Sequence, residues 1–162
     1  MENIAHQPAT RRVLLTAVGS FIGYFGVAST FALRPAIATP ASMAAAIREA
    51  VGEAALHQGR VKLEIPPLVE NGNTVSMTIS VDSPMTELDH VKSIHIFNEK
   101  NPQPNVTTFH LTPRVGRARV STRIRLADSQ KVVAIARLSD DSYWYDSVDV
   151  MVTLAACLED LR

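Results

Sequence analysis

The sequence predicts a mainly β protein, an immunoglobulin-like two-sheet sandwich with an N-terminal helix. About seven short segments alternate apolar and polar residues with a period of two, which is the pattern of half-buried strands. Clusters of Asp, Asn, Ser, Gly and Pro separate these segments and supply the turns that such a fold needs. The Cys-Trp-Cys core of true immunoglobulin domains is absent, because the chain has one cysteine.

The first predicted element is a helix over about residues 42–56. Ser42 is a suitable N-cap, and the residues from Met43 to Leu56 are rich in Ala, Ile, Arg and Glu. Gly52 falls inside this helix, and Gly59 is expected to end it.

Two strands with a clear period of two follow the helix. Residues 61–65 and 75–81 each alternate apolar and polar side chains, so each is predicted to bury one face. Between them, Asn71 and Gly72 form a pair that tolerates the positive φ of tight hairpin turns. A hairpin turn is therefore expected there.

Five further strands complete the predicted sandwich, which we place over residues 39–154. They lie near residues 91–98, 106–111, 118–126, 132–138 and 148–154. The breaks between them fall at residues 82–84, 101–104, 113–116 and 139–142. Residues 155–162 follow the last strand as a C-terminal arm.

Residues 1–38 are predicted to be a signal peptide of the twin-arginine type. Arg11 and Arg12 precede a mildly apolar run to about Leu33, and residues 36–38 read Ala-Ile-Ala, a small-residue cleavage pattern. This layout predicts export to the periplasm. The alternative is a retained transmembrane anchor, since the run is just long enough to span a bilayer, but its glycines and hydroxyl residues favour export.

The charge balance limits the choice of partner. Residues 39–162 contain 13 basic and 15 acidic residues, a net charge near −2. A polyanion such as nucleic acid is not indicated by this balance, and no stable membrane anchor is expected.

A row of arginines is the first candidate site. In the segment 117–126, Ala118, Val120, Ile124 and Leu126 share one face of the predicted strand. The opposite face carries Arg117, Arg119, Arg123 and Arg125. The simpler interpretation is a solvated face beside carboxylates of neighbouring strands. The alternative is a contact for an anion, such as an oxysulfur species, or for an acidic partner.

No metal site, cofactor or catalytic machinery is predicted. Four of the five histidines follow the predicted signal peptide and are scattered, without the spacing of a metal site; they are His57, His90, His95 and His110. A blue-copper site at Cys157 is not expected, because no histidine follows that cysteine. Phosphate-binding glycine loops, Ser-His-Asp patterns and paired carboxylates do not stand out either.

Cys157 is the second candidate site. A lone cysteine in an exported protein is buried, paired with another chain, or chemically employed. In the last predicted strand, Val148, Val150, Val152 and Leu154 should face the core. Continuing that alternation places Cys157 on the outward face. The spacing alone leaves an inert and a working thiol equally open.

The order of several short motifs resembles the SoxY family, the covalent sulfur-carrier subunits of the periplasmic thiosulfate-oxidising (Sox) system. The motifs are Leu63-Glu64-Ile65-Pro66, Glu70-Asn71-Gly72-Asn73, Val81-Asp82-Ser83-Pro84-Met85, Val91-Lys92-Ser93-Ile94, Glu99-Lys100-Asn101-Pro102, Ser121-Thr122-Arg123-Ile124-Arg125-Leu126-Ala127 and the terminal strand with Cys157. The resemblance implies a carrier, not an enzyme, that pairs with a SoxZ-like subunit and is served by sulfur-oxidising enzymes. It implies that Cys157 bears the sulfur, joined oxidatively to thiosulfate by a haem enzyme.

The arm departs from the family pattern. The family reads Gly-Gly-Cys-Gly-Gly, whereas this chain reads Ala155-Ala156-Cys157-Leu158-Glu159-Asp160. Alanine and leucine make the arm stiffer and bulkier than glycine, and the two carboxylates disfavour a nearby thiolate and repel anionic thiosulfate. The alternative function is therefore a SoxY-like interaction subunit whose arm no longer carries sulfur.

Overall fold

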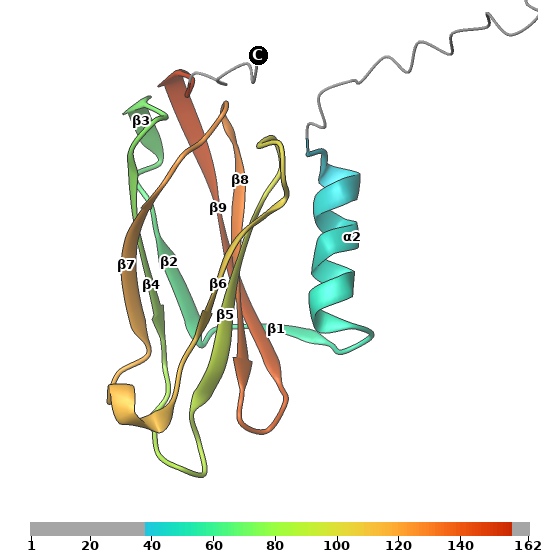
Figure 1. Ribbon diagram of the computed structural model, residues 1–162, viewed down its shortest axis with the longest axis vertical. Helices are drawn as coiled ribbons and strands as arrows, with labels where there is room; N and C mark the ends of the chain where they lie inside the picture. Colours follow the sequence, from blue (N-terminus) through green and yellow to red (C-terminus); the bar gives the residue numbers. More distant parts are fainter. Residues whose placement is uncertain (1–37, 157–162) are drawn as a thin grey trace, which may run out of the picture. The chain divides into compact units, whose positions relative to one another are not determined.

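Two β-sheets pack face to face, and the helix labelled α2 lies against the outer face of the larger sheet (Figure 1). The computed structural model describes residues 38–156. The predicted fold class, a mainly β two-sheet sandwich with an N-terminal helix, is confirmed. The elements in chain order are α2 (Pro40–Val51), β1 (Leu56–Gln58), β2 (Val61–Glu64), β3 (Leu68–Asn71), β4 (Val75–Val81), β5 (Val91–Asn98), β6 (Asn105–His110), the short 3-10 helix η1 (Pro113–Val115), β7 (Arg119–Ile124), β8 (Gln130–Leu138) and β9 (Tyr143–Leu154).

The larger sheet is built around β9. Its strand order is β1-β9-β8-β5-β6, and β3 also pairs with β9, farther along that strand. Both β1 and β3 run parallel to β9, whereas the β9–β8, β8–β5 and β5–β6 pairs are antiparallel. The smaller sheet has the order β2-β4-β7, with antiparallel pairing throughout.

The main core lies between the two sheets. Period-two alternation sends every second side chain inward, so β4 alone buries Val75, Met77, Ile79 and Val81. Ile79, Ile94 and Ile96 have no solvent exposure. Burying one large aliphatic side chain contributes about 1.5–3 kcal/mol, so these strands hold the sandwich together chiefly through such residues.

The helix begins two residues earlier than predicted, and its N-cap lies three residues earlier. Thr39, not Ser42, is the N-cap, and Ser42 occupies the third helical position. The two residues form a reciprocal capping box: the Ser42 amide donates to Thr39 Oγ1 (3.1 Å) and the Thr39 amide donates to Ser42 Oγ (2.7 Å). Pro40 fits the first helical turn because its missing N–H would have no partner there.

The helix also ends earlier than predicted, at Val51. Gly52 adopts φ 69° and caps the helix, so it does not lie in the helix interior, and Gly59 does not end it. Met43 and Val51 pack against Phe97, Ile135 and Tyr143 on the outer face of the larger sheet, which forms a second apolar cluster.

The structure adds two strands that the sequence pattern did not predict. β1 and β3 are three and four residues long, and each is held by parallel pairing with β9. A turn does follow Asn71, at Gly72 and Asn73, but the expected hairpin is wrong, because β3 ends at Asn71 and pairs with β9 instead of β4. β9 begins at Tyr143, five residues before the predicted start.

The last strand buries fewer residues than its alternation predicted. Val150 is buried, while Val148 and Val152 are partly buried. Leu154 was expected in the core but is 63% exposed, because β9 reaches the end of the sandwich there. Within residues 38–156, no helix has the length and apolar character needed to cross a membrane.

Candidate functional site

The structure defines the base from which the C-terminal arm leaves the sandwich. β9 ends at Leu154, and Ala155 and Ala156 continue the chain. Ala156 is only 7% exposed, and its backbone amide donates to the carbonyl oxygen of Leu126 (3.2 Å). Cys157, the predicted sulfur-bearing residue, lies outside the described residues, as do the predicted signal peptide and the tail after Cys157.

Gly72 contributes a further backbone segment to this base. Its amide donates to the Leu154 carbonyl (2.9 Å), and its carbonyl accepts from the Leu126 amide (2.8 Å). A Cβ at Gly72 would overlap the Leu126 carbonyl oxygen and lie 2.9 Å from the Ala156 nitrogen. Glycine is therefore needed at residue 72 because three backbone segments meet there. Sequence reasoning missed this role; the only available signal was the glycine in the Asn-Gly pair.

A partly buried polar network fixes the linker between β7 and β8, where Leu126 lies. The Asn101 side chain donates to the Arg125 carbonyl (2.8 Å) and accepts from the Ala127 amide (3.0 Å). The Gln130 amide nitrogen donates to the same Asn101 oxygen (2.9 Å). Asn101 thus holds both neighbours of Leu126, the partner of Ala156, which makes the arm base a preorganised part of the fold.

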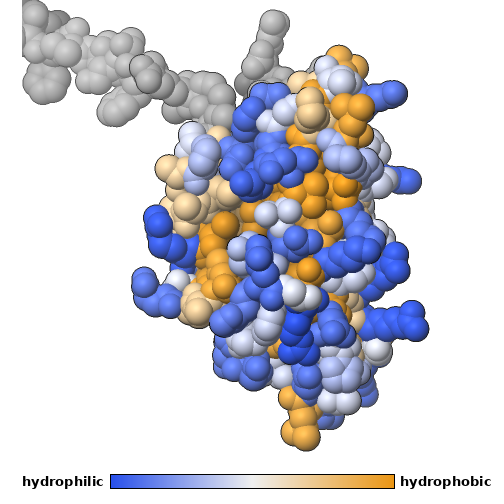
Figure 2. All heavy atoms as spheres, turned by 180° about the vertical axis from the view of Figure 1, so that it is seen from behind, coloured by the Kyte–Doolittle hydropathy of each residue, from blue (hydrophilic) through white to orange (hydrophobic). Residues whose placement is uncertain are grey.

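The structure confirms the arrangement of the arginine-bearing strand. Ala118, Ile124 and Leu126 are buried, whereas Arg117, Arg119, Arg123 and Arg125 are all exposed. β7 pairs only with β4, so it forms an edge of the smaller sheet. Hydrophilic side chains project along the side of the molecule that carries β7 (Figure 2, right). Among the described residues, none of the four arginines lies within 4.0 Å of a carboxylate.

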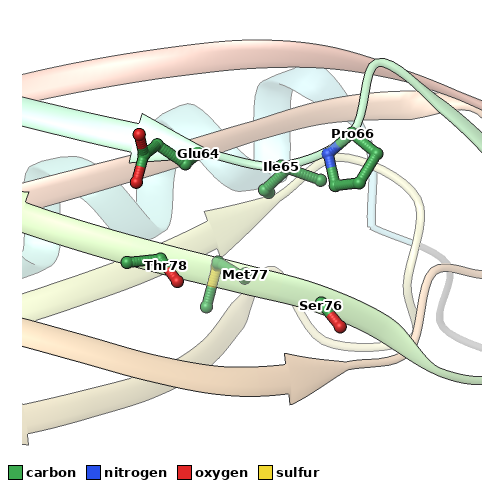
Figure 3. A pocket seen from close by; sticks show the side chains of 6 residues that line it. All are labelled: Glu64, Ile65, Pro66, Ser76, Met77 and Thr78. Atoms are coloured by element: carbon green, nitrogen blue, oxygen red, sulfur yellow. The ribbon is translucent and has the colours of Figure 1, made fainter.

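The outer face of the smaller sheet holds a shallow hollow of about 470 Å³ (Figure 3). It lies between the end of β2, with Ile65 and Pro66, and the neighbouring part of β4, with Ser76 and Met77. The one titratable group that lines it, Glu64, forms an ion pair with Lys62 (2.7 Å). The hydrogen bond from Lys62 lowers the pKa of Glu64, so this carboxylate stays ionised and is not suited to act as an acid. The hollow has no paired acid and base and does not resemble an active site.

An exposed apolar patch flanks the arm base on the other sheet. Leu68 and Met151 are register partners in the β3–β9 pair and are 59% and 64% exposed. Leu154 is also exposed, but it is three residues beyond Met151 and therefore lies on the other face of β9, outside this patch. Figure 2 shows exposed hydrophobic residues bordered by polar ones on the face seen there. Patches of this kind mark protein interaction sites more often than isolated exposed leucines do.

The histidines form no metal centre in the described part of the chain. No group of three or more His, Cys, Asp and Glu side chains in residues 38–156 is placed to hold a metal ion. His95 on β5 hydrogen-bonds with Ser93 Oγ (2.9 Å) and Thr108 Oγ1 (3.1 Å). Burial, followed by the nearby charges of His110 and Arg137, lowers the pKa of His95. Its contacts are those of a structural residue.

The fold and the site define an immunoglobulin-like β-sandwich whose last strand ends at a preorganised arm base, next to the chain's one cysteine. Residues 47–157 match the family of the sulfur oxidation protein SoxY, and the match extends to that cysteine. The chain belongs to the SoxY family. Sequence comparison with curated proteins gives no match.

Solved structures share this fold. The structure of the sulfur carrier protein SoxY from Chlorobium limicola f thiosulfatophilum matches with a TM-score of 0.59 and 24% identity, covering 70% of this chain and 98% of that one. Superoxide reductase (neelaredoxin) from Ignicoccus hospitalis matches with a TM-score of 0.52 and 17% identity, covering 58% and 80%. At these identities the likeness concerns the fold.

Proposed function

We propose that this chain carries sulfur intermediates covalently on Cys157 during thiosulfate oxidation, as a complex with a SoxZ-like subunit. The observation that carries the proposal is the family match, which includes Cys157. The SoxY structure from Chlorobium is that of a sulfur carrier protein, and it shares this fold over nearly its whole length. In this role the chain is a substrate carrier, and the catalytic groups belong to the enzymes that visit it.

The chemistry requires a thiol. In the loading step, the sulfur of Cys157 and the terminal sulfur of thiosulfate form a sulfur–sulfur bond. The thiol proton goes to solvent, and two electrons go to the haem enzyme. The bond is stable enough to be carried and is labile to attack by another thiolate. A position next to the end of β9 presents the thiol to a separate active site.

The proposed setting is the periplasm, reached by the twin-arginine route. The motif that supports it is the Arg11-Arg12 pair with the apolar run and the Ala-Ile-Ala pattern that follow it. We place the SoxZ-like subunit on the apolar patch of Leu68 and Met151. Burial of these two exposed apolar side chains beside the arm base would strengthen the complex and keep the arm at its border.

A second candidate function is supported by the arm itself. Ala156 is buried and hydrogen-bonded, and the arm has alanines where the family has glycines. A held, non-glycine arm would suit a subunit that binds the SoxZ-like partner but no longer carries sulfur. Loading of Cys157 distinguishes the two functions.

The deciding experiment is mass spectrometry of the full-length chain, co-expressed with its SoxZ-like partner and exposed to thiosulfate and the haem enzyme. A sulfur adduct on Cys157 that a reductant removes is the expected result, and Cys157→Ser should show no adduct. A variant with glycine at residues 155, 156, 158 and 159 serves as the positive control for the enzyme. Loading of that variant while the natural arm stays unmodified would establish the second candidate function.

The partner assignment has its own test. Leu68→Lys with Met151→Lys should abolish co-purification with the SoxZ-like subunit, because two charges would be buried in the interface. Val115→Lys, at a 51% exposed residue of η1 far along the chain from the patch, is the matched control. Unchanged co-purification of the double variant would place the partner elsewhere.

A further inference from the structure

Two arginines lie at the arm base, and the described residues give them no counter-ion. Arg125 directly precedes Leu126, whose carbonyl accepts the hydrogen bond from the Ala156 amide. Arg123 lies two residues earlier on the same exposed face of β7. Glu64 on β2, which is separated from β7 by β4, is already paired with Lys62. Both guanidinium groups are therefore available to an anionic partner at the root of the arm.

The chain supplies such a partner immediately after the arm base. Glu159 and Asp160 follow Ala156 by three and four residues. An extended residue covers at most about 3.6 Å, so both carboxylates fall within about 11–14 Å of the hydrogen bond between Ala156 and Leu126. Arg125 is one Cα–Cα step of about 3.8 Å from Leu126. The tail is therefore long enough for its carboxylates to reach the two arginines, and its charges are opposite to theirs.

We propose that Glu159 and Asp160 bind Arg123 and Arg125, so that the acidic tail is held against the end of β7 and its charge beside Cys157 is neutralised. The site is a docking surface for the chain's own C-terminus. It counters the effect of two carboxylates on a nearby thiolate. The inference concerns the tail alone and does not depend on whether Cys157 carries sulfur.

The other two arginines do not take part. Arg119 and Arg123 are four residues apart on β7, which separates them by about 13 Å in a strand. The Debye length at 0.1 M salt is about 10 Å, so charges at Arg117 and Arg119 are largely screened from the tail. Arg117 and Arg119 therefore provide a matched control with the same chemistry at the other end of the same segment.

The first experiment follows the arginine Nε–Hε groups by NMR in the full-length chain. Neutralising the tail with Glu159→Gln and Asp160→Asn should shift the signals of Arg123 and Arg125 and leave those of Arg117 and Arg119 in place. Equal shifts in all four, or no shift at Arg123 and Arg125, would overturn the proposal.

The second experiment measures the reactivity of the thiol with iodoacetamide, a neutral reagent that labels only Cys157 because the chain has one cysteine. Arg123→Gln with Arg125→Gln should slow alkylation about threefold at low salt, since the two carboxylates then oppose the thiolate without compensation. The effect should vanish at high salt, where the charges are screened. Arg117→Gln with Arg119→Gln should leave the rate unchanged.

A variant that combines the tail and the arginine substitutions tests whether the arginines affect Cys157 through the acidic tail. When Glu159→Gln and Asp160→Asn are already present, the substitutions at Arg123 and Arg125 should change the alkylation rate by less than half of their effect in the chain with the natural tail. A full-sized effect in the neutral-tail background would show that the arginines act on the thiol or on another ligand directly. That result would overturn the docking of the tail.

Discussion

The Ala156 amide and the Leu126 carbonyl form a hydrogen bond (3.2 Å) that joins the end of the larger sheet to the linker that leaves the smaller one. The Leu126 amide in turn donates to the Gly72 carbonyl (2.8 Å). Three chain segments that are far apart in the sequence therefore meet at the base of the arm. The position of the arm is a property of the whole sandwich, and changes at residues remote from Cys157 should alter it.

Gly72→Ala is expected to loosen the arm base. The new methyl group would overlap the Leu126 carbonyl oxygen, so the backbone must move and the hydrogen bonds of Gly72 and Ala156 must weaken. We expect a loss of about 1–3 kcal/mol in the free energy of unfolding. Hydrogen exchange of the Leu126 and Ala156 amides should become faster, and the denaturation midpoint should fall.

The control for that variant is Gly52→Ala at the end of α2. Nothing lies within 4 Å of a Cβ there, but the positive φ of 69° strains alanine. It should cost about 1 kcal/mol without changing exchange at Leu126 or Ala156. Equal exchange in the two variants would show that crowding at Gly72 has no special role.

Ile79→Asp should abolish soluble expression. Ile79 has no solvent exposure and lies in the core between the sheets, so the variant buries an unpaired carboxylate. Ser76→Asp is the matched control, because Ser76 is exposed on the opposite face of β4 and is the register partner of Arg123. The yield of soluble protein from the two variants makes the comparison. A soluble, folded Ile79→Asp protein would contradict the core assignment.

His95 should make the protein less stable in mild acid. Its pKa in the folded state is below the ordinary 6.5, chiefly because burial disfavours the charged ring. The unfolded chain then binds more protons, so the contribution of His95 is complete above pH 6.5 and is lost as pH falls through the lower folded-state pKa. Urea denaturation from about pH 7.5 to about pH 5 should show this loss, and His95→Gln should remove it.

Thr108→Val distinguishes the effect of protonating His95 from the effect of its hydrogen bond to Thr108. It removes the hydroxyl partner of His95 (3.1 Å) but leaves the imidazole. The variant should be less stable at every pH by about 1 kcal/mol and should keep the dependence on pH. If His95→Gln keeps that dependence as well, another group is responsible.

Asn98→Leu should stabilise the protein. The Asn98 side chain is fully buried, and neither its oxygen nor its nitrogen has a hydrogen-bond partner in the described part of the chain. A leucine of similar shape avoids the desolvation cost, so the free energy of unfolding should rise by about 1–2 kcal/mol. Asn101→Leu, which breaks satisfied bonds in the neighbouring network, should instead lower it. Destabilisation by Asn98→Leu would show that the amide is satisfied.

The strands that sequence reasoning located are those with one buried face. β4 and β7 alternate strictly, because each packs one side against the core and exposes the other, and their bounds were predicted to within two residues. The exposure of all four arginines followed from the same alternation. Periodicity therefore predicted correctly which side chains of this segment are exposed; whether the four arginines bind an anion or a partner stays a prediction.

The missed elements have no such signature. β1 exposes all three of its residues, and β3 buries only Val69, so neither strand has an alternating pattern that the sequence could reveal. Both are held in place by backbone pairing with β9. The hydrogen bonds of Ala156, Leu126 and Gly72 join backbone groups, which every sequence possesses. The end of the helix at Gly52 depended on a positive φ, and composition alone did not distinguish Gly52 from Gly59.

The hydrogen bond of the Ala156 amide also limits how far the thiol of Cys157 can extend from the sandwich, and therefore how deep the active site of an enzyme that acts on it can be. The chain is held up to the residue before the cysteine, and consecutive Cα atoms are about 3.8 Å apart. An arm free from Leu154 onwards could extend the thiol by about 10–11 Å. An enzyme serving this arm must therefore have a shallow entrance that admits little more than one residue, or must break the bond to Leu126 before the thiol can enter.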